Sequence, residues 1–80
     1  MAGSVVKHWW NGRWGRLTRR DVYVRTHGKR YELELREGGS EGTSWRRLFD
    51  TLDDAVGEAG KHMSPDMTWS DITDAHRTER

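Results

Sequence analysis

A run of apolar residues at helical spacing, directly after a strand-like segment, is the feature that most limits what this chain can fold into. Five apolar residues fall on one stripe of a helix: Leu52, Ala55, Val56, Ala59 and Met63. Thr51 stands at the N-cap position, Asp54 complements the free amides of the first turn, and Pro65 stops the helix. The pattern predicts a helix over residues 51–63. Because its apolar stripe is narrow, this helix needs an apolar surface to cover.

Residues 21–36 alternate as two strands and supply part of that surface. A tight turn at His27 and Gly28 sets Val24 opposite Tyr31. This pairing places five apolar side chains on one face: Val22, Val24, Tyr31, Leu33 and Leu35. The other face is then mostly charged.

A further strand is predicted over residues 44–49, with Trp45 and Phe49 directed inward and Arg47 on the same face. We expect a bulge or an extended, solvent-seeking side chain at Arg47. The main sheet then covers residues 21–49. The predicted fold class is α+β: an antiparallel meander of four to five strands with one helix packed on one face.

An amino-terminal hairpin is predicted over residues 5–17, because Asn11 and Gly12 are a strong hairpin signal. This turn pairs Trp9 with Trp14. Two choices remain for the buried face. We expect the one that buries Val6, Trp10 and Leu17, because it places the aliphatic side chains inward; the face left exposed then carries Lys7, Trp9, Trp14 and Arg16.

Length and composition exclude several classes of protein. With 80 residues, the chain forms one small domain, placed at residues 1–73, and a polar tail at 74–80 that we expect to be frayed. The absence of cysteine excludes disulfides and thiolate metal sites, and favours a cytoplasmic location. No apolar run approaches the ~20 residues of a membrane span.

The residue types that carry catalysis are not arranged for it. Glu58 and His62 stand one helical turn apart, a spacing that we interpret as a solvated pair rather than a metal site. The glycine-rich residues 38–42 lack the Lys and Ser or Thr of a phosphate-binding loop. The aspartates at the start of the helix fit its dipole. We therefore expect no enzymatic activity, no metal and no cofactor.

Charge is segregated along the chain, although the net charge is only +1. Residues 1–30 hold eight basic residues and one acidic residue, whereas residues 31–80 hold six basic and twelve acidic residues. Arginine and tryptophan interleave over residues 9–20. Basic residues with aromatic neighbours are typical of nucleic-acid binding, through phosphate contacts and base stacking.

The strand–helix junction resembles that of two DNA-binding families, the plant-type AP2 domain and the arm-type N-terminal domain of phage integrases. The similar positions follow the pattern Arg-x-Phe-Asp-Thr-x-x-Asp-Ala-x-x-x-Ala: Phe49, Asp50, Thr51, Asp54, Ala55 and Ala59. The resemblance spans residues 22–63 and implies a three-stranded sheet in the major groove with the helix behind it. The whole chain also resembles small accessory proteins of phages from GC-rich hosts, in its Asp-Val-Tyr, Gly-Gly-x-x-Gly and Trp-x-Asp-Ile-Thr segments.

We therefore predict a small nucleic-acid-binding accessory protein, encoded by a phage and acting on duplex DNA in the host cytoplasm. The expected contact residues lie in the amino-terminal hairpins: Lys7, Arg13, Trp14, Arg16, Arg19, Arg20, Arg25, Lys29 and Arg30. The alternative hypothesis is a protein-interaction module that docks on an acidic host protein or on a second copy of itself, because a basic half and an acidic half are complementary.

Overall fold

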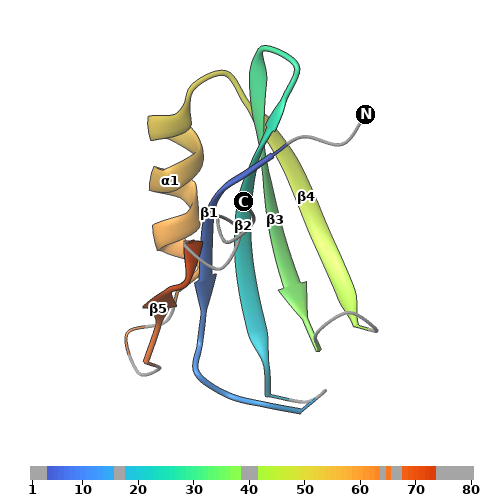
Figure 1. Cartoon of the computed structure of the whole chain (residues 1–80), viewed down its shortest axis with the longest axis vertical. Helices are drawn as coiled ribbons and strands as arrows, with labels where there is room; N and C mark the ends of the chain where they lie inside the picture. Colours follow the sequence, from blue (N-terminus) through green and yellow to red (C-terminus); the bar gives the residue numbers. More distant parts are fainter. Residues whose placement is uncertain (1–3, 16–17, 39–41, 64, 66–67, 74–80) are drawn as a thin grey trace, which may run out of the picture.

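The computed structural model describes residues 4–15, 18–38, 42–63, 65 and 68–73. Its strands are β1 (Val5–Trp10), β2 (Arg20–His27), β3 (Arg30–Glu37), β4 (Thr43–Phe49) and β5 (Ser70–Asp71). They form one antiparallel sheet in the order β4-β3-β2-β1-β5, and the helix α1 (Leu52–Lys61) lies across one face of it (Figure 1). The predicted α+β class, with one helix on a single face of a sheet of four to five strands, is confirmed.

The core lies between α1 and the central strands. Its buried apolar residues are Val22, Val24, Leu33, Ala55 and Ala59. The two alanines are the helix positions in deepest contact, and their small side chains let α1 approach the sheet closely. The Thr51 hydroxyl accepts a hydrogen bond from the Asp54 amide at 3.1 Å, as expected of an N-cap. The helix ends at Lys61, two residues before the predicted end.

The hairpin of β2 and β3 forms with a register two residues away from the predicted one. Val24 lies opposite Leu33 rather than Tyr31, and the turn consists of Gly28 and Lys29. Gly28 has a φ of 62°, a left-handed conformation that glycine adopts without steric cost. Because side chains alternate with a period of two, this shift keeps every residue on its predicted face.

The predicted hairpin over residues 5–17 is wrong, because β1 pairs with β2 and β5 instead. Trp9 lies opposite Val22 and Trp10 lies opposite Asp21, so the expected pairing of Trp9 with Trp14 does not form. Asn11 instead donates its amide to the carbonyl of Arg20, the first residue of β2, at 3.1 Å. Leu17 and Arg16 lie outside the described residues.

The expected burial is wrong for Trp9 and Trp10, whereas the inward Val6 and the exposed Trp14 are confirmed. Trp9 packs against the core on the helix side, whereas Trp10 lies on the opposite face. Val6 packs against the core as well, because an irregularity in register between Val5 and Lys7 changes the alternation there. The face we call the helix-free face, opposite α1, therefore carries His8 and Trp10 of β1.

The two edges of the sheet differ. β5 covers β1, where the Ile72 amide donates to the His8 carbonyl at 2.8 Å and the His8 amide donates to the Thr73 hydroxyl at 3.0 Å. β4 pairs with β3 in an unbroken register, so the bulge expected near Arg47 is absent from this strand. No helix in the described part of the chain is long and apolar enough to cross a membrane.

Candidate functional site

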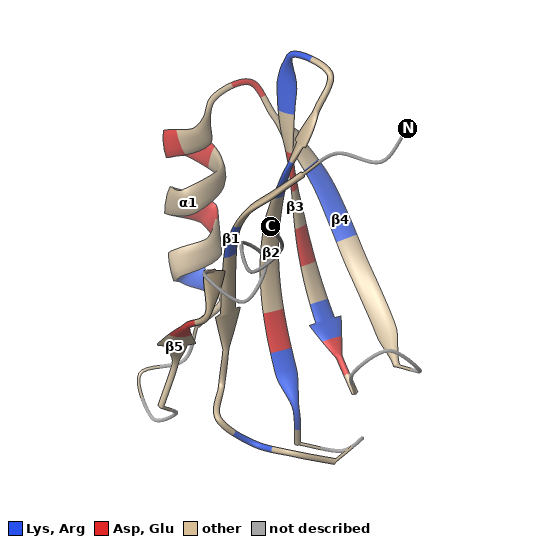
Figure 2. Ribbon diagram, in the orientation of Figure 1, with Lys and Arg blue, Asp and Glu red and all other residues tan. Residues whose placement is uncertain are grey.

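The fold separates the nine residues predicted to bind a partner. Arg13, Trp14, Arg19 and Arg20 lie near one end of β2, whereas Lys29 and Arg30 lie at the turn beyond its other end. At ~3.3 Å per residue, Arg20 and Lys29 are roughly 30 Å apart along the strand. Basic residues accordingly appear at both ends of the hairpin in Figure 2. Lys7 lies on the helix side of β1, Arg25 lies on the helix-free face, and Arg16 falls outside the described residues.

The acidic half of the chain already neutralises most of these cations. The ion pairs that involve them are Lys7–Asp71, Arg19–Asp21, Arg20–Glu37, Arg25–Glu32, Arg25–Glu34 and Arg30–Asp50. Of the predicted cations that the structure describes, Arg13 and Lys29 have no carboxylate of a described residue within 4.0 Å. The opposite charges of the two halves of the sequence therefore largely neutralise each other within one chain.

Glu34 is a fully buried carboxylate on the helix-free face, with a relative exposure of 0%. Arg25 Nη1 lies 2.5 Å from one of its oxygens and Arg36 Nη2 lies 2.8 Å from the other, while Arg46 reaches it at 3.7 Å. Burial by itself would raise the pKa of Glu34, but the hydrogen bonds and charges of Arg25 and Arg36 hold it below its usual value. The carboxylate therefore stays ionised and fixes the arginines around it.

Asp21 is a second buried carboxylate on this face. It accepts hydrogen bonds from Arg19 Nε at 2.7 Å and lies 2.8 Å from His8 Nε2. Burial would raise the pKa of Asp21, yet the hydrogen bonds with Arg19 and His8 lower it, so this group is also ionised. The His8 ring stacks on Tyr23 with centroids 4.0 Å apart, and the Arg25 guanidinium lies 4.6 Å over the Tyr23 ring. Contacts through His8, Tyr23 and Arg25 thus connect the two buried carboxylates.

The connection from β1 to β2, which we call the Trp–Arg loop (residues 11–15, 18 and 19), presents an aromatic surface. The Arg19 guanidinium lies 5.2 Å from the centroids of both the Trp10 and Trp14 rings. The two rings meet edge to face, with centroids 4.7 Å apart. Trp14 is 71% exposed, the most exposed of the large apolar residues described.

Asn11 holds the Trp–Arg loop in place. The residue is 1% exposed, and its side chain donates to the Thr18 carbonyl at 2.8 Å and accepts from the amides of Arg13 and Arg20 at 3.2 and 3.0 Å. The Thr18 hydroxyl also donates to the Trp14 carbonyl. The loop therefore presents Trp14 from a backbone that its own hydrogen bonds fix.

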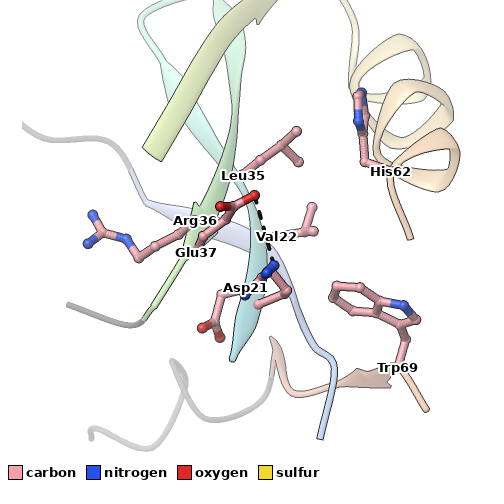
Figure 3. Close-up of a pocket in the computed structure, with 8 residues that line it drawn as sticks. Asp21, Val22, Leu35, Arg36, Glu37, His62 and Trp69 are labelled. Carbon is pink, nitrogen blue, oxygen red and sulfur yellow. Dashed lines mark ion pairs between the residues drawn. The ribbon is translucent and has the colours of Figure 1, made fainter. Parts of the chain in front are cut away.

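A hollow of about 250 Å³ lies between the end of α1 and the sheet. Figure 3 shows the side chains of Val22, Leu35 and Trp69 around it, with His62 on the helix side. Arg20 and Glu37, which also line it, form an ion pair of 3.9 Å. The hollow is apolar at its base, so it suits a small apolar group. The described residues include no group of three His, Cys, Asp or Glu side chains that could hold a metal ion.

Comparison with known proteins does not decide among functions. The chain matches no protein-family model, no curated protein and no solved structure. The function must therefore be argued from the Trp–Arg loop and the sheet themselves.

Sequence reasoning missed Trp10, Arg36 and Arg46 as members of these surfaces. The alternation of β3 carried a signal for Arg36, because Glu32, Glu34 and Arg36 share one face. Arg46 joins them only through the register of β4, where it lies opposite Glu34. Trp10 was assigned to the core, because the wrong hairpin turned it inward.

Proposed function

We propose that this chain is a small nucleic-acid-binding protein that stacks unpaired bases on Trp14. The observation that supports this proposal is the 71% exposure of Trp14 in a loop fixed by hydrogen bonds. An aromatic ring that is already held in place binds a flat partner without further loss of loop entropy. The exposed Arg13 supplies positive charge next to Trp14 in the chain, and Arg19, which is paired with Asp21, lies 5.2 Å from the centroids of both indole rings.

Single-stranded nucleic acid suits this surface better than the duplex DNA expected from the sequence. Bases in a duplex already stack on each other, whereas an unpaired base has a free face for an indole. Duplex binding also draws much of its affinity from phosphate contacts, and most of the predicted cations are engaged with carboxylates. We therefore expect contact with only about two or three phosphates, and a log–log salt slope of roughly −1.4 to −2.

The sheet register supports a path for the strand beyond Trp14. Trp10, Asp21 and Arg36 lie opposite one another on β1, β2 and β3, on the helix-free face. With strands ~4.8 Å apart, this row is about 10 Å long, within reach of one or two nucleotides. Arg36 is anchored by Glu34 and its side chain is partly exposed, so it can contact a phosphate while keeping that ion pair.

Fluorescence anisotropy with a labelled oligothymidine of about fifteen nucleotides tests the proposal. At low salt, Trp14→Ala should weaken binding by roughly 5- to 150-fold, because stacking on one aromatic ring contributes ~1–3 kcal/mol per base. Trp45→Ala is the matched control: Trp45 is 43% exposed but lies on the helix side of β4, so its loss should leave binding unchanged.

Three outcomes would contradict the proposal in different ways. If the protein binds neither single-stranded nor duplex DNA at low salt, the nucleic-acid function is rejected. Tighter binding to a duplex of the same length rejects the stacking mode. Equal losses for Trp14→Ala and Trp45→Ala place the contact elsewhere. The phage origin belongs to the same proposal, and the genes that flank the coding sequence test it.

A further inference from the structure

The outer edge of β4 is the longest unpaired strand edge in the described part of the chain. β4 has seven residues and pairs with β3 alone, whereas β5 lies against β1 at the other edge of the sheet. Thr43 through Arg47 are all exposed. Along such an edge, alternate residues direct their N–H and C=O groups outward, ready to pair with another strand. In Figure 1, β4 lies at the side of the sheet away from β1 and β5.

We propose that β4 docks an extended acidic segment of a partner protein, which adds to the sheet as a further strand. Backbone hydrogen bonds along an exposed edge supply affinity in this mode, and side chains on the two faces supply specificity. The charge of β4 identifies the chemistry of the segment. Arg46 and Arg47 are adjacent near the middle of the strand, so they project to opposite faces of the sheet.

Both arginines can accept a carboxylate from outside. Arg47 has no carboxylate of a described residue within 4.0 Å, and its guanidinium lies 5.0 Å over the Phe49 ring. The Arg46 side chain is 56% exposed and reaches only Glu34, at 3.7 Å. Arg25 and Arg36 hold Glu34 more closely, at 2.5 and 2.8 Å, so the contact with Arg46 is the weakest of the three.

The neighbouring side chains limit the sequence of the segment. On the helix side, Trp45 and Phe49 flank Arg47, which favours apolar residues on both sides of one acidic residue. The shallow hollow that Arg47 lines also contains Asp53, Asp54 and Glu58 of α1 and one further cation, Lys61, so this side accommodates a single acidic residue, placed directly at Arg47, and no second one. The segment that fits is therefore an adjacent acidic pair between apolar or β-branched residues, with one acid for each face.

A second copy of this chain fits the edge poorly. Antiparallel pairing of β4 with β4 about its central residue sets Arg46 opposite Arg46 of the other copy. Like charges at directly opposed positions are destabilising, and cationic edge strands are a recurrent protection against self-pairing. The same charges attract an acidic strand, so the edge discriminates in favour of a different chain.

Titration of the full-length protein with a labelled peptide of alternating Val and Thr around a central Asp-Glu pair tests the proposal. We expect saturable binding at low salt, and at least tenfold weaker binding of the matched peptide with Asn-Gln at its centre. The double variant Arg46→Glu and Arg47→Glu should lose at least tenfold in affinity for the acidic peptide and gain affinity for one with a central Lys-Arg pair. Arg13→Glu, an exposed cation in the Trp–Arg loop, is the control and should change peptide affinity less than twofold.

Amide hydrogen exchange distinguishes strand addition from charge attraction alone. The peptide should slow the exchange of alternate amides within residues 43–49, and leave the amides of β1 unchanged. No binding of the acidic peptide at low salt, no protection in β4, or an equal loss for Arg13→Glu would each overturn the proposal. Sedimentation that shows a dimer dissociated by the β4 double variant would assign the edge to a second copy instead. Binding of oligothymidine is read in a separate titration, so failure here leaves the stacking proposal standing.

Discussion

Replacement of Glu34 by glutamine should destabilise the fold, because this buried carboxylate holds the arginines of the helix-free face. Three hydrogen bonds to it are charge-assisted: one from Arg25 at 2.5 Å and two from Arg36, at 2.8 and 3.2 Å. Such bonds contribute ~1.5–3 kcal/mol each. The arginine side chains are 25% and 22% exposed, so water recovers part of the loss. We expect Glu34→Gln to lower the free energy of unfolding by about 2–3 kcal/mol.

This loss is a large share of the ~4–12 kcal/mol expected for a domain of this size, and it should lower the Tm by roughly 10–20 °C. Urea denaturation followed by circular dichroism at neutral pH measures it. Glu32→Gln is the matched control, because Glu32 lies on the same strand and face but contacts Arg25 only at 3.9 Å and is more exposed. Its loss should stay below about 1 kcal/mol.

The dependence on pH gives an independent check. The pKa of Glu34 is lowered in the folded protein, so its contribution is complete above the unfolded pKa of ~4.3 and is lost as the pH falls through the folded value. The difference between the wild type and Glu34→Gln should therefore shrink below pH ~4. Losses for Glu34→Gln and Glu32→Gln that agree within about 0.5 kcal/mol at neutral pH would refute the assigned role of the buried carboxylate.

Two further predictions concern β1 and the loop that follows it. Trp9→Ala should lower the free energy of unfolding by about 2–4 kcal/mol, measured by thermal or urea denaturation, because Trp9 packs against the core. This loss should exceed that of Trp10→Ala or Trp14→Ala. The reverse order would mean that the faces of β1 are misassigned. Asn11→Ala removes three partly buried hydrogen bonds and should cost about 2–4 kcal/mol. It should also weaken the binding of oligothymidine, because Trp14 loses its fixed loop; unchanged stability would show that the loop keeps its conformation without Asn11.

The sequence by itself determined the local elements and the faces of the central strands. The helix was predictable because its apolar stripe, the Thr51 cap and the acidic first turn agree with one another. The alternation of β2 and β3 fixed which side chains point toward the helix, although not the register, because a shift by two residues satisfies the same pattern. The α+β class followed from these elements, since one narrow helix stripe needs one apolar sheet face.

Only the tertiary structure decided which strand β1 pairs with and which groups the charged side chains contact. Asn11 and Gly12 favour a tight turn locally, but the Asn11 side chain instead bonds to Thr18 and Arg20, residues too distant in sequence for a hairpin rule to include. The basic and acidic halves looked complementary between molecules, yet antiparallel pairing of β2 with β3 brings Arg25 to Glu34 within one chain. Sequence periodicity reports which face a residue occupies. Its partner on that face depends on strand order and register, which arise only when distant segments pack together.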